Sequence, residues 1–263
     1  MVKKISIYGI EGIPLIKPGD NIAEIIIKAL EKENISLQDK DIILIAQSII
    51  SKSLGLILDL NKIDVSVKAK KIWERISQKS KEKNLPSINP EFIQVVIDES
   101  NEIIRAEHIL ITETKHGFIC ANAGVDRSNS MGKNKVTLLP REPDKEALKI
   151  RNYIKEKTGK NVAIVITDSF GRPFRKGSVG VAIGTSGIEP LYDRRGEKDL
   201  YGYELEDTIV GHIDNLASAS QLIMGESNEG IPVVIIRGYN FELNEKASIN
   251  QIIIEKDFDL FRR

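Results

Sequence analysis

Apolar residues recur every three or four positions in five stretches of the chain, which is the spacing of one face of an α-helix. Ile22, Ile25, Ile26 and Ala29 form the first such face, and Asp20 just before it is placed to cap the helix. The same spacing predicts helices over 67–83, from Asn89-Pro90, from Pro143-Asp144 and over 208–224. These helices are expected to pack on a core that is mainly aliphatic and rich in isoleucine.

Short apolar runs between these stretches predict buried β-strands. The runs cover 5–8, 41–46, 161–167 and 231–236. Two further runs, 109–112 and 118–121, flank Lys115-His116-Gly117 and predict a hairpin. Residues 47–52 are interpreted as a polar exit from a strand, and the strand at 161–167 is expected to stop at Asp168-Ser169. Glycine and charge dominate 171–202, where no period predicts an element.

Composition excludes several classes of protein. Lysine plus arginine total 38 and aspartate plus glutamate total 38, so the formal net charge is zero. This argues against a protein that holds nucleic acid by a global positive field. The N-terminal residues lack the apolar core of a signal peptide, and no apolar run is long enough to span a bilayer. We therefore expect a cytoplasmic protein that binds neither nucleic acid nor membrane.

The residues available for chemistry favour oxygen ligands. One cysteine, Cys120, and three scattered histidines exclude an intrachain disulfide, a CxxC redox motif and an HExxH zinc helix. Four elements end abruptly in polar residues, and these ends carry both carboxylates and neutral oxygens. They are Asp126, Asp168 and Glu226, with Ser128, Asn129 and Ser169. Such a set could bind Mg²⁺ or Mn²⁺, which prefer oxygen ligands.

Phosphate binding would have to be of an uncommon kind, because the GxxxxGK[ST] and GxGxxG fingerprints are absent. Lys52, Arg172, Arg175 and Lys176 could supply the positive charge. Simpler interpretations stay open for these residues. Asp126 could only form an Asx-turn, and the Arg172–Lys176 cluster could be a solvated loop.

The remaining reactive side chains have structural interpretations. His116 is placed at the tip of the predicted hairpin, and His212 lies in the long helix, where a half-buried packing role is expected. Cys120 lies in an apolar strand and is interpreted as a small core residue rather than a nucleophile.

Six segments carry a resemblance to a known family. They are Gly-Ile-Pro-Leu-Ile at 12–16, Ser-Ile-Ile-Ser-Lys at 48–52, Asn-Ala-Gly-Val-Asp-Arg-Ser-Asn at 122–129, Ile-Thr-Asp-Ser-Phe-Gly-Arg-Pro-Phe-Arg at 166–175, Lys-Asp-Leu-Tyr-Gly at 198–202 and Met-Gly-Glu…Gly-Ile-Pro at 224–232. In these segments the chain resembles the coenzyme F420-0:L-glutamate ligases, also called F420 gamma-glutamyl ligases. The segments occur in the family's order and span nearly the whole chain.

The resemblance implies both a fold and an activity. It implies an α+β fold with mixed sheets and helices, in two intertwined lobes at roughly 1–115 and 116–263, and a homodimer. The chain is expected to be the ligase unit alone, without the nitroreductase-like C-terminal domain of some members. The implied reaction uses GTP to join one or more L-glutamates to F420-0 and releases GDP and phosphate. Two Mg²⁺ or Mn²⁺ ions per subunit are implied, and potassium is expected to assist.

The resemblance also implies residue roles. Metal ligation is implied for Asp126 and Asp168 at one ion and for Ser169 and Glu226 at the other, with Ser169 standing where a close relative has threonine. Contact with GTP is implied for two loops and four single residues: Ile13, Pro14, Leu15 and Ile16, then Gln47, Ser48, Lys52 and Asn129, then Met224, Gly225, Glu226, Ser227, Asn228, Glu229, Gly230 and Ile231. Gln47 differs from the residue expected at its position.

The implied mechanism is phosphorylation of the F420-0 lactyl carboxylate by GTP, followed by attack of the amino group of glutamate. Asp126, Asp168 and Lys52 would act in catalysis. Arg194, Arg195 and Lys198 are candidates for holding the carboxylate of glutamate. Two alternatives are a metal-dependent nucleotide phosphohydrolase and a related ligase with another acceptor. A GTP-binding protein without turnover is a third.

Overall fold

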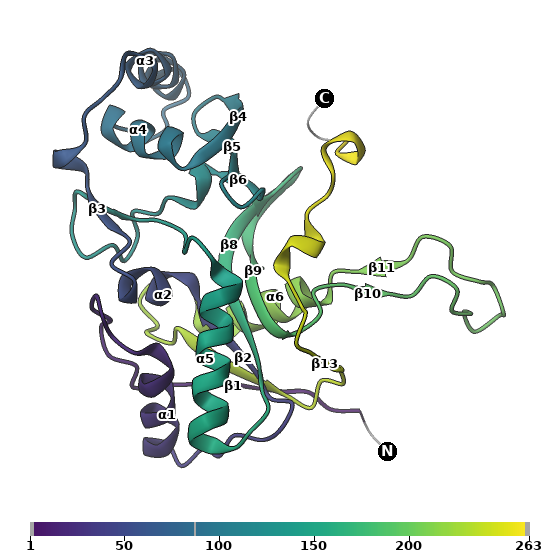
Figure 1. The fold of residues 1–263 in the computed structure, drawn as a ribbon. Coiled ribbons are helices and arrows are strands. Elements are labelled where there is room, and N and C mark those ends of the chain that lie inside the picture. Colours follow the sequence, from purple (N-terminus) through teal and green to yellow (C-terminus); the bar gives the residue numbers. More distant parts are fainter. Residues whose placement is uncertain (1–2, 87, 261–263) are drawn as a thin grey trace.

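The centre of the molecule is a six-stranded mixed sheet with the strand order β1-β12-β2-β8-β9-β13 (Figure 1). The computed structural model describes residues 3–86 and 88–260. The strands are β1 (Ser6–Gly9), β2 (Ile42–Ala46), β3 (Ile57–Asp59), β4 (Ser100–Ala106), β5 (Leu110–Thr114), β6 (Ile119–Ala121), β7 (Lys135–Thr137), β8 (Ala163–Arg172), β9 (Arg175–Ile188), β10 (Tyr192–Asp193), β11 (Ile209–Val210), β12 (Val233–Arg237) and β13 (Leu243–Asn244). The α-helices are α1 (Ile22–Lys32), α2 (Gln47–Ser53), α3 (Val67–Glu82), α4 (Pro90–Asp98), α5 (Pro143–Thr158) and α6 (His212–Met224). Short 3₁₀ turns are η1 (Leu60–Lys62), η2 (Asn122–Gly124), η3 (Ile249–Ile252) and η4 (Lys256–Phe258). The α+β class with mixed sheets is therefore confirmed.

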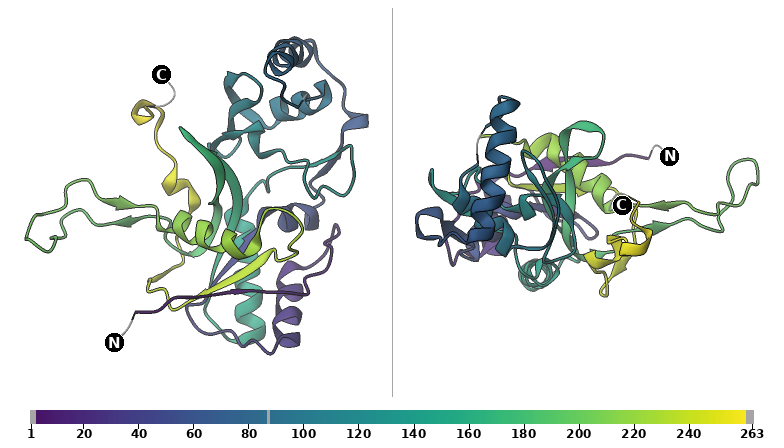
Figure 2. Two further views of the ribbon diagram at one scale, coloured as in Figure 1. Left: turned by 180° about the vertical axis from the view of Figure 1, so that it is seen from behind. Right: turned by 90° about the horizontal axis from the view of Figure 1, so that it is seen from above.

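Helices cover both faces of the central sheet. The helices α1 and α5 lie against one face, and α6 lies against the other, as the front and back views show (Figures 1 and 2). The strands β2 and β8 run parallel, and their side chains from Ile42 to Ile45 and from Ala163 to Ile166 are buried completely. A strand buried on both faces has an unbroken apolar sequence instead of an alternating one, which explains the runs at 41–46 and 161–167.

A second hydrophobic core lies beside the first. It joins α3, α4 and the three-stranded sheet β4-β5-β6, and its buried residues come from 60–138. The predicted hairpin is confirmed, because β5 and β6 pair antiparallel around Lys115-His116-Gly117. The division of the chain into two lobes near residue 115 stays a prediction.

Two helix starts differ from the prediction. Asn21, not Asp20, caps α1, because the Asn21 side chain accepts a hydrogen bond from the backbone N–H of Glu24 at 3.2 Å. Asp20 instead accepts from the N–H of Lys17 at 2.7 Å and closes the preceding turn. The last long helix begins at His212 and not at 208, because Ile209–Val210 pairs with Tyr192–Asp193 as β11.

The predicted polar exit at 47–52 is wrong. Residues Gln47–Ser53 form α2 directly after β2. The helix has apolar residues inward at Ile49 and Ile50, but it is only 7 residues long, too short for a period to be legible in the sequence.

The predicted end of the strand at Asp168 is also wrong. β8 continues to Arg172 and pairs with β9, a 14-residue strand in the stretch where the sequence predicted no element. Glycines interrupt the apolar pattern of this strand at positions where neighbouring helices approach its backbone closely. A Cβ at Gly180 would lie 2.5 Å from the carbonyl oxygen of Ala217 on α6, and one at Gly184 would lie 2.6 Å from Pro143 on α5.

Two antiparallel ribbons extend from the sheet. β8 pairs with β2 only as far as Thr167, so from Asp168 to Arg172 it pairs with β9 alone. We call residues 168–180 the β8–β9 ribbon. The strands β10 and β11 form a second, long arm that projects from the body (Figure 1). In residues 3–86 and 88–260, no helix has the length and apolarity needed to cross a bilayer.

Candidate functional site

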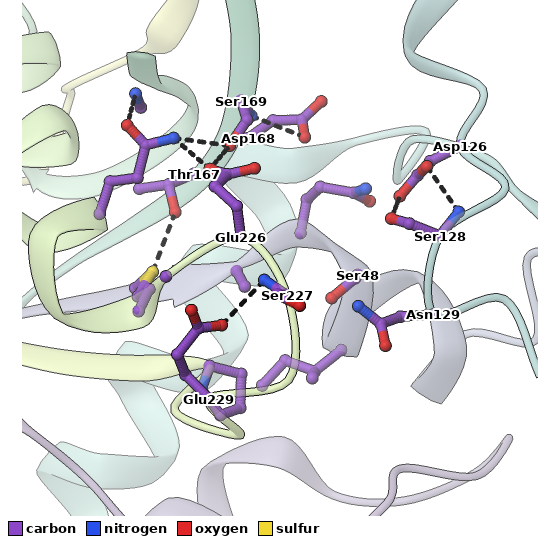
Figure 3. Close-up of a pocket in the computed structure, with 18 of the residues that line it drawn as sticks. Ser48, Asp126, Ser128, Asn129, Thr167, Asp168, Ser169, Glu226, Ser227 and Glu229 are labelled. Atoms are coloured by element: carbon purple, nitrogen blue, oxygen red, sulfur yellow. Dashed lines mark hydrogen bonds between the residues drawn. The ribbon is translucent and has the colours of Figure 1, made fainter. Parts of the chain in front are cut away.

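A cleft of about 590 Å³ opens where the β2–α2 junction, the 122–129 loop, the β8–β9 ribbon and the 224–231 loop meet. Every residue for which the family resemblance implied nucleotide or metal contact lies in its lining. These are Ile13, Pro14, Leu15, Ile16, Gln47, Ser48, Lys52, Asp126, Asn129, Asp168, Ser169, Met224, Gly225, Glu226, Ser227, Asn228, Glu229, Gly230 and Ile231. Arg172, Arg175 and Lys176, offered as phosphate-binding cations, are not among the described lining residues. Folding thus brings together segments that lie far apart in the sequence. Figure 3 shows Asp126, Ser128 and Asn129 on one side of the cleft and Glu226, Ser227 and Glu229 on the other.

Asp126 is held in a fixed orientation by its own loop. Its Oδ1 accepts a hydrogen bond from the backbone N–H of Ser128 at 2.8 Å, and its Oδ2 accepts from the Ser128 hydroxyl. This is the Asx-turn that the sequence offered as the simpler interpretation of this residue. The backbone of Asp126 also pairs with Thr137 at the end of β7, which anchors the loop beside the cleft.

Asp168 is the most perturbed carboxylate of the cleft. Its pKa is raised from 3.8 to about 7. Burial is the main cause and the negative charges of Asp126 and Glu226 contribute, while a hydrogen bond from the N–H of Ser169 opposes the shift. A register shift between Ile166 and Thr167 precedes it, where β9 has one extra residue. Such bulges re-aim the side chains that follow them and are common beside active sites.

Ser169 and Glu226 belong to one hydrogen-bond network (Figure 3). The Ser169 hydroxyl donates to Glu226 Oε1 at 2.5 Å, and Gln221 Nε2 donates to both of these oxygens. The orientation of Gln221 is fixed at its other end, because its Oε1 accepts from the N–H of Gly180 at 2.7 Å. Gln221 was not predicted from the sequence. The signal was present, since Gln221 is a polar residue four positions after Ala217 and three before Met224 on the inward face of α6.

The 224–231 loop is shaped by one glycine and one glutamate. Gly225 has a φ of +68°, and a Cβ there would lie 2.0 Å from the carboxyl carbon of Glu229. Glu229 folds back over this glycine, and its Oε2 accepts from the N–H of Ser227 at 2.8 Å. Hydrogen bonds from the loop's own backbone N–H groups, that of Ser227 foremost, lower the pKa of Glu229. The loop therefore needs glycine at 225 and holds a carboxylate at the mouth of the cleft.

The helix α2 and the 13–16 loop complete the walls. Lys52 is half-buried, and this burial lowers the pKa of its ammonium group, although the nearby Asp126 carboxylate opposes the change. Gln47 is buried, and its Oε1 accepts from the Ser51 hydroxyl at 2.8 Å, so this oxygen already has a partner. Leu15 is 93% exposed in the 13–16 loop and gives that wall an apolar surface.

The donor set suits a divalent cation only in part. In the described part of the chain, no three carboxylate, histidine or cysteine side chains converge on one point. The available oxygens are those of Asp126, Asp168, Ser169 and Glu226, which hard cations such as Mg²⁺ prefer. A cation would also relieve the repulsion that raises the pKa of Asp168. The residues therefore fit an ion that takes one or two carboxylates and completes its shell with phosphate oxygens and water.

The other candidate side chains have structural roles. His116 Nε2 lies 2.8 Å from the carbonyl oxygen of Pro140, and the ring stacks on Phe118. His212 is buried at the start of α6, with Nδ1 2.8 Å from the hydroxyl of Tyr239 and Nε2 2.5 Å from the carbonyl of Glu189. Cys120 is buried in the cleft wall, and burial raises the pKa of its thiol to about 12. That environment makes Cys120 a poor nucleophile.

None of the three candidates for holding glutamate is among the described residues that line this cleft. Arg194, Arg195 and Lys198 lie on the β10–β11 arm. Two of them form local ion pairs there, Arg194 with Glu197 and Arg195 with Asp193. Among the described residues that line the cleft, Lys52 is the one cation, whereas four residues carry carboxylates. These are the side chains of Asp126, Asp168, Glu226 and Glu229.

A cleft that holds a carboxylate with a pKa near neutrality, next to fixed hydrogen-bond donors, is typical of an enzyme's active site. The comparisons with known proteins agree with this class. The family model described as F420-0:Gamma-glutamyl ligase matches residues 11–238. The coenzyme F420:L-glutamate ligase of Methanothermobacter thermautotrophicus is 44% identical over 260 residues, which cover 98% of this chain and 99% of that protein. The protein of the same name from Methanococcus maripaludis strain C7 is 45% identical over 262 residues, with 98% of each chain covered, and that of Archaeoglobus fulgidus is 38% identical over 260 residues, with 99% and 97% covered. The chain belongs to the F420-0:Gamma-glutamyl ligase family.

Proposed function

We propose that this protein is a ligase of coenzyme F420 biosynthesis that uses GTP to join L-glutamate to F420-0. The observation that carries the proposal is the convergence of widely separated segments on one cleft that combines carboxylates, a lysine and an apolar wall. The proposal is supported by the similarity of the chain, over nearly all of its length, to coenzyme F420:L-glutamate ligases.

The nucleotide is proposed to occupy the part of the cleft between the 13–16 loop, α2 and the 224–231 loop. The apolar wall at Leu15 suits a purine base, and the half-buried Lys52 suits a phosphate. A phosphate beside Lys52 would favour its charged form and so reverse the pKa shift that burial causes. Figure 3 draws Asn129 next to Ser48, and both line the cleft.

The chemistry has two steps. A carboxylate oxygen of F420-0 attacks the γ-phosphorus of GTP, the bond to the bridging oxygen breaks, and GDP leaves with the electron pair. The amino nitrogen of glutamate then attacks the carbonyl carbon of the acyl phosphate. Phosphate leaves, and the nitrogen loses a proton as the amide forms. Asp126, Asp168 and Lys52 act by positioning and by charge, since phosphoryl transfer depends mainly on these two effects.

Divalent cations belong to this proposal. Asp126 and Asp168 would hold one ion, and Ser169 and Glu226 a second. Bound there, the ions would supply positive charge to offset the charge of the transferring phosphoryl group. Gln221 keeps Ser169 and Glu226 turned toward the cleft. The proposal also includes a homodimer, which light scattering tests. It includes a potassium requirement as well, which omission of potassium from the assay tests.

The deciding experiment is an incubation of the purified protein with F420-0, L-glutamate, GTP and Mn²⁺, followed by mass spectrometry. The proposal predicts a gain of one or more glutamyl units with GDP formed in step. The control omits glutamate, and a parallel reaction replaces GTP with ATP. GDP formation without a mass gain would favour a phosphohydrolase or a ligase with another acceptor. Binding of GTP without any GDP would favour a protein that senses the nucleotide.

A further inference from the structure

Arg127 lies between residues that line the cleft, but its side chain reaches the second core instead. Asp126, Ser128 and Asn129 line the cleft, and Arg127 is not among the described lining residues. We propose that Arg127 is a positioning residue, which anchors the 122–129 loop to α4 and thereby holds Asp126 and Asn129 in place for a metal–nucleotide complex. The inference rests on the proposed function, since it concerns the same cleft.

Two contacts join Arg127 to the start of α4. Its Nη2 donates a hydrogen bond to Oδ1 of Asn89 at 2.6 Å, and its guanidinium carbon lies 4.2 Å from the centre of the Phe92 ring. Phe92 is buried in the second core, so the cation lies over a ring that is itself held in place. Arginine suits this position because its planar group can lie on a ring and donate hydrogen bonds at the same time.

Asn89 does not cap its own helix, although asparagine commonly does so at this position. It directly precedes α4 and has the extended backbone of an N-cap, with a φ of −87° and a ψ of 156°. Its side chain nevertheless makes no capping hydrogen bond in α4, and its oxygen accepts from Arg127. A contact with the loop therefore replaces a local bond that would stabilise the helix.

The loop depends on an external anchor because its own backbone is unfavourable. Ala123, Asn129 and Met131 have φ values of 55°, 49° and 66°, in the left-handed region. Residues other than glycine adopt this region at a steric cost, which is smallest for asparagine and aspartate. The Asp126 carboxylate bonds to Ser128, two positions away, so this bond orients it within the loop and not relative to the rest of the cleft.

The place of the loop determines how the carboxylates of the cleft lie relative to one another. Ala123 and Val125 are buried in the second core, whereas Asp168 belongs to β8 of the central sheet. Asp126 therefore enters the cleft from the side of the second core, and Arg127 ties its loop to that core at α4. Ligands of one site must be held to within about 0.5 Å, so a small movement of this loop would weaken cation binding.

The test compares the wild type with Arg127→Gln in two measurements. Hydrogen–deuterium exchange of the metal-free protein, read by mass spectrometry, reports the mobility of residues 122–133. We expect exchange there to be about tenfold faster in the variant, the factor expected when one hydrogen bond to a charged group is lost, and exchange of α2 to stay unchanged. The affinity for Mn²⁺ in the presence of GDP, measured by electron paramagnetic resonance, should fall about tenfold.

A second variant removes the same contact from the other side. Asn89→Ala deletes the accepting oxygen without changing the charge of the loop. Because Asn89 makes no capping bond in α4, this variant should fold as the wild type does. It should lower the Mn²⁺ affinity as well, and the double variant should bind no more weakly than Arg127→Gln alone, because both substitutions remove one shared contact.

Arg75→Gln is the matched control. Arg75 is an exposed arginine of α3 that donates to the carbonyl oxygen of Ala106 in the second core, at 3.2 Å. Its substitution should change neither the exchange of the loop nor the Mn²⁺ affinity. Fluorescence of the single tryptophan, Trp73, shows whether the second core stays folded, because its indole N–H donates to the carbonyl oxygen of Ile88 beside Asn89.

Three results would overturn the positioning role: unchanged Mn²⁺ affinity in Arg127→Gln, unchanged exchange of its loop, or a double variant that binds Mn²⁺ clearly more weakly than Arg127→Gln. A wild-type protein that neither binds Mn²⁺ with GDP nor forms a glutamylated product would overturn the proposed function. The exchange measurement would then still decide whether Arg127 anchors the loop, because it needs neither ligand nor turnover.

Discussion

Replacing Asp168 by asparagine tests the electrostatics of the cleft and its proposed chemistry together. Asparagine keeps the shape and the oxygen that accepts the hydrogen bond from Ser169, but it cannot ionise. The substitution should leave the fold intact and abolish turnover, because a neutral amide is a weak ligand for a divalent cation. The same substitution should change how stability depends on pH.

The pKa of Asp168 determines the size of this change. In the folded, metal-free protein the pKa is raised from 3.8 to about 7. Between these two values the folded state keeps a proton that the unfolded state has released, so stability falls as pH rises through this window. At about 1.4 kcal/mol per pKa unit, the loss reaches about 4 kcal/mol above pH 7. The Asp168→Asn variant avoids this loss. The free energy of unfolding of the variant minus that of the wild type should therefore rise by about 4 kcal/mol across the window.

Urea unfolding followed by far-UV circular dichroism measures this difference, with a chelator present, at several values between about pH 4 and pH 8. Glu31→Gln, which removes an exposed carboxylate on α1, controls for the loss of one charge. Addition of Mn²⁺ and GTP should stabilise the wild type by about 2.7 kcal/mol at a hundredfold excess over Kd and stabilise the variant less. A free-energy difference that stays constant with pH would refute the reasoning on burial. Full turnover by the variant at ordinary metal concentrations would contradict the ligand role.

Two further predictions concern neighbours of Asp168. Gln221→Met removes the N–H donor shared by Ser169 and Glu226. The affinity for Mn²⁺ in the presence of GDP, measured by electron paramagnetic resonance, should therefore fall by about 10- to 100-fold. An unchanged Mn²⁺ affinity would show that Gln221 does not position these ligands. The Cys120 thiol, whose pKa is about 12, should react slowly with a thiol reagent at about pH 8 in the native protein and quickly in urea, and rapid native labelling would contradict the burial of this side chain.

The chemistry of the site was more predictable than its architecture. The motifs at 12–16, 48–52, 122–129, 166–175 and 224–232 all contribute to one cleft, as their resemblance to a family implied. The strand β9 and the helix α2 were not predicted. In β9, glycines at 180 and 184 admit the backbones of α6 and α5, so the apolar pattern of a strand is interrupted.

The sequence by itself predicts an element when its burial produces a regular spacing of apolar residues or when local residues fix where it begins. The spacing from Ile22 to Ala29 is enough for α1, and Asn89-Pro90 is enough to start α4. These features depend on neighbours within four positions along the chain, and a periodic sequence records such neighbours directly.

The place where the functional groups meet depends instead on contacts between distant segments. The parallel pairing of β2 with β8 places Ala46 beside Thr167, and that pairing sets Lys52 and Asp168 around the same cleft. The raised pKa of Asp168 and the fixed orientation of Gln221 follow from this convergence, because desolvation and charge repulsion depend on distance in space. No local pattern in the sequence records distances of that kind.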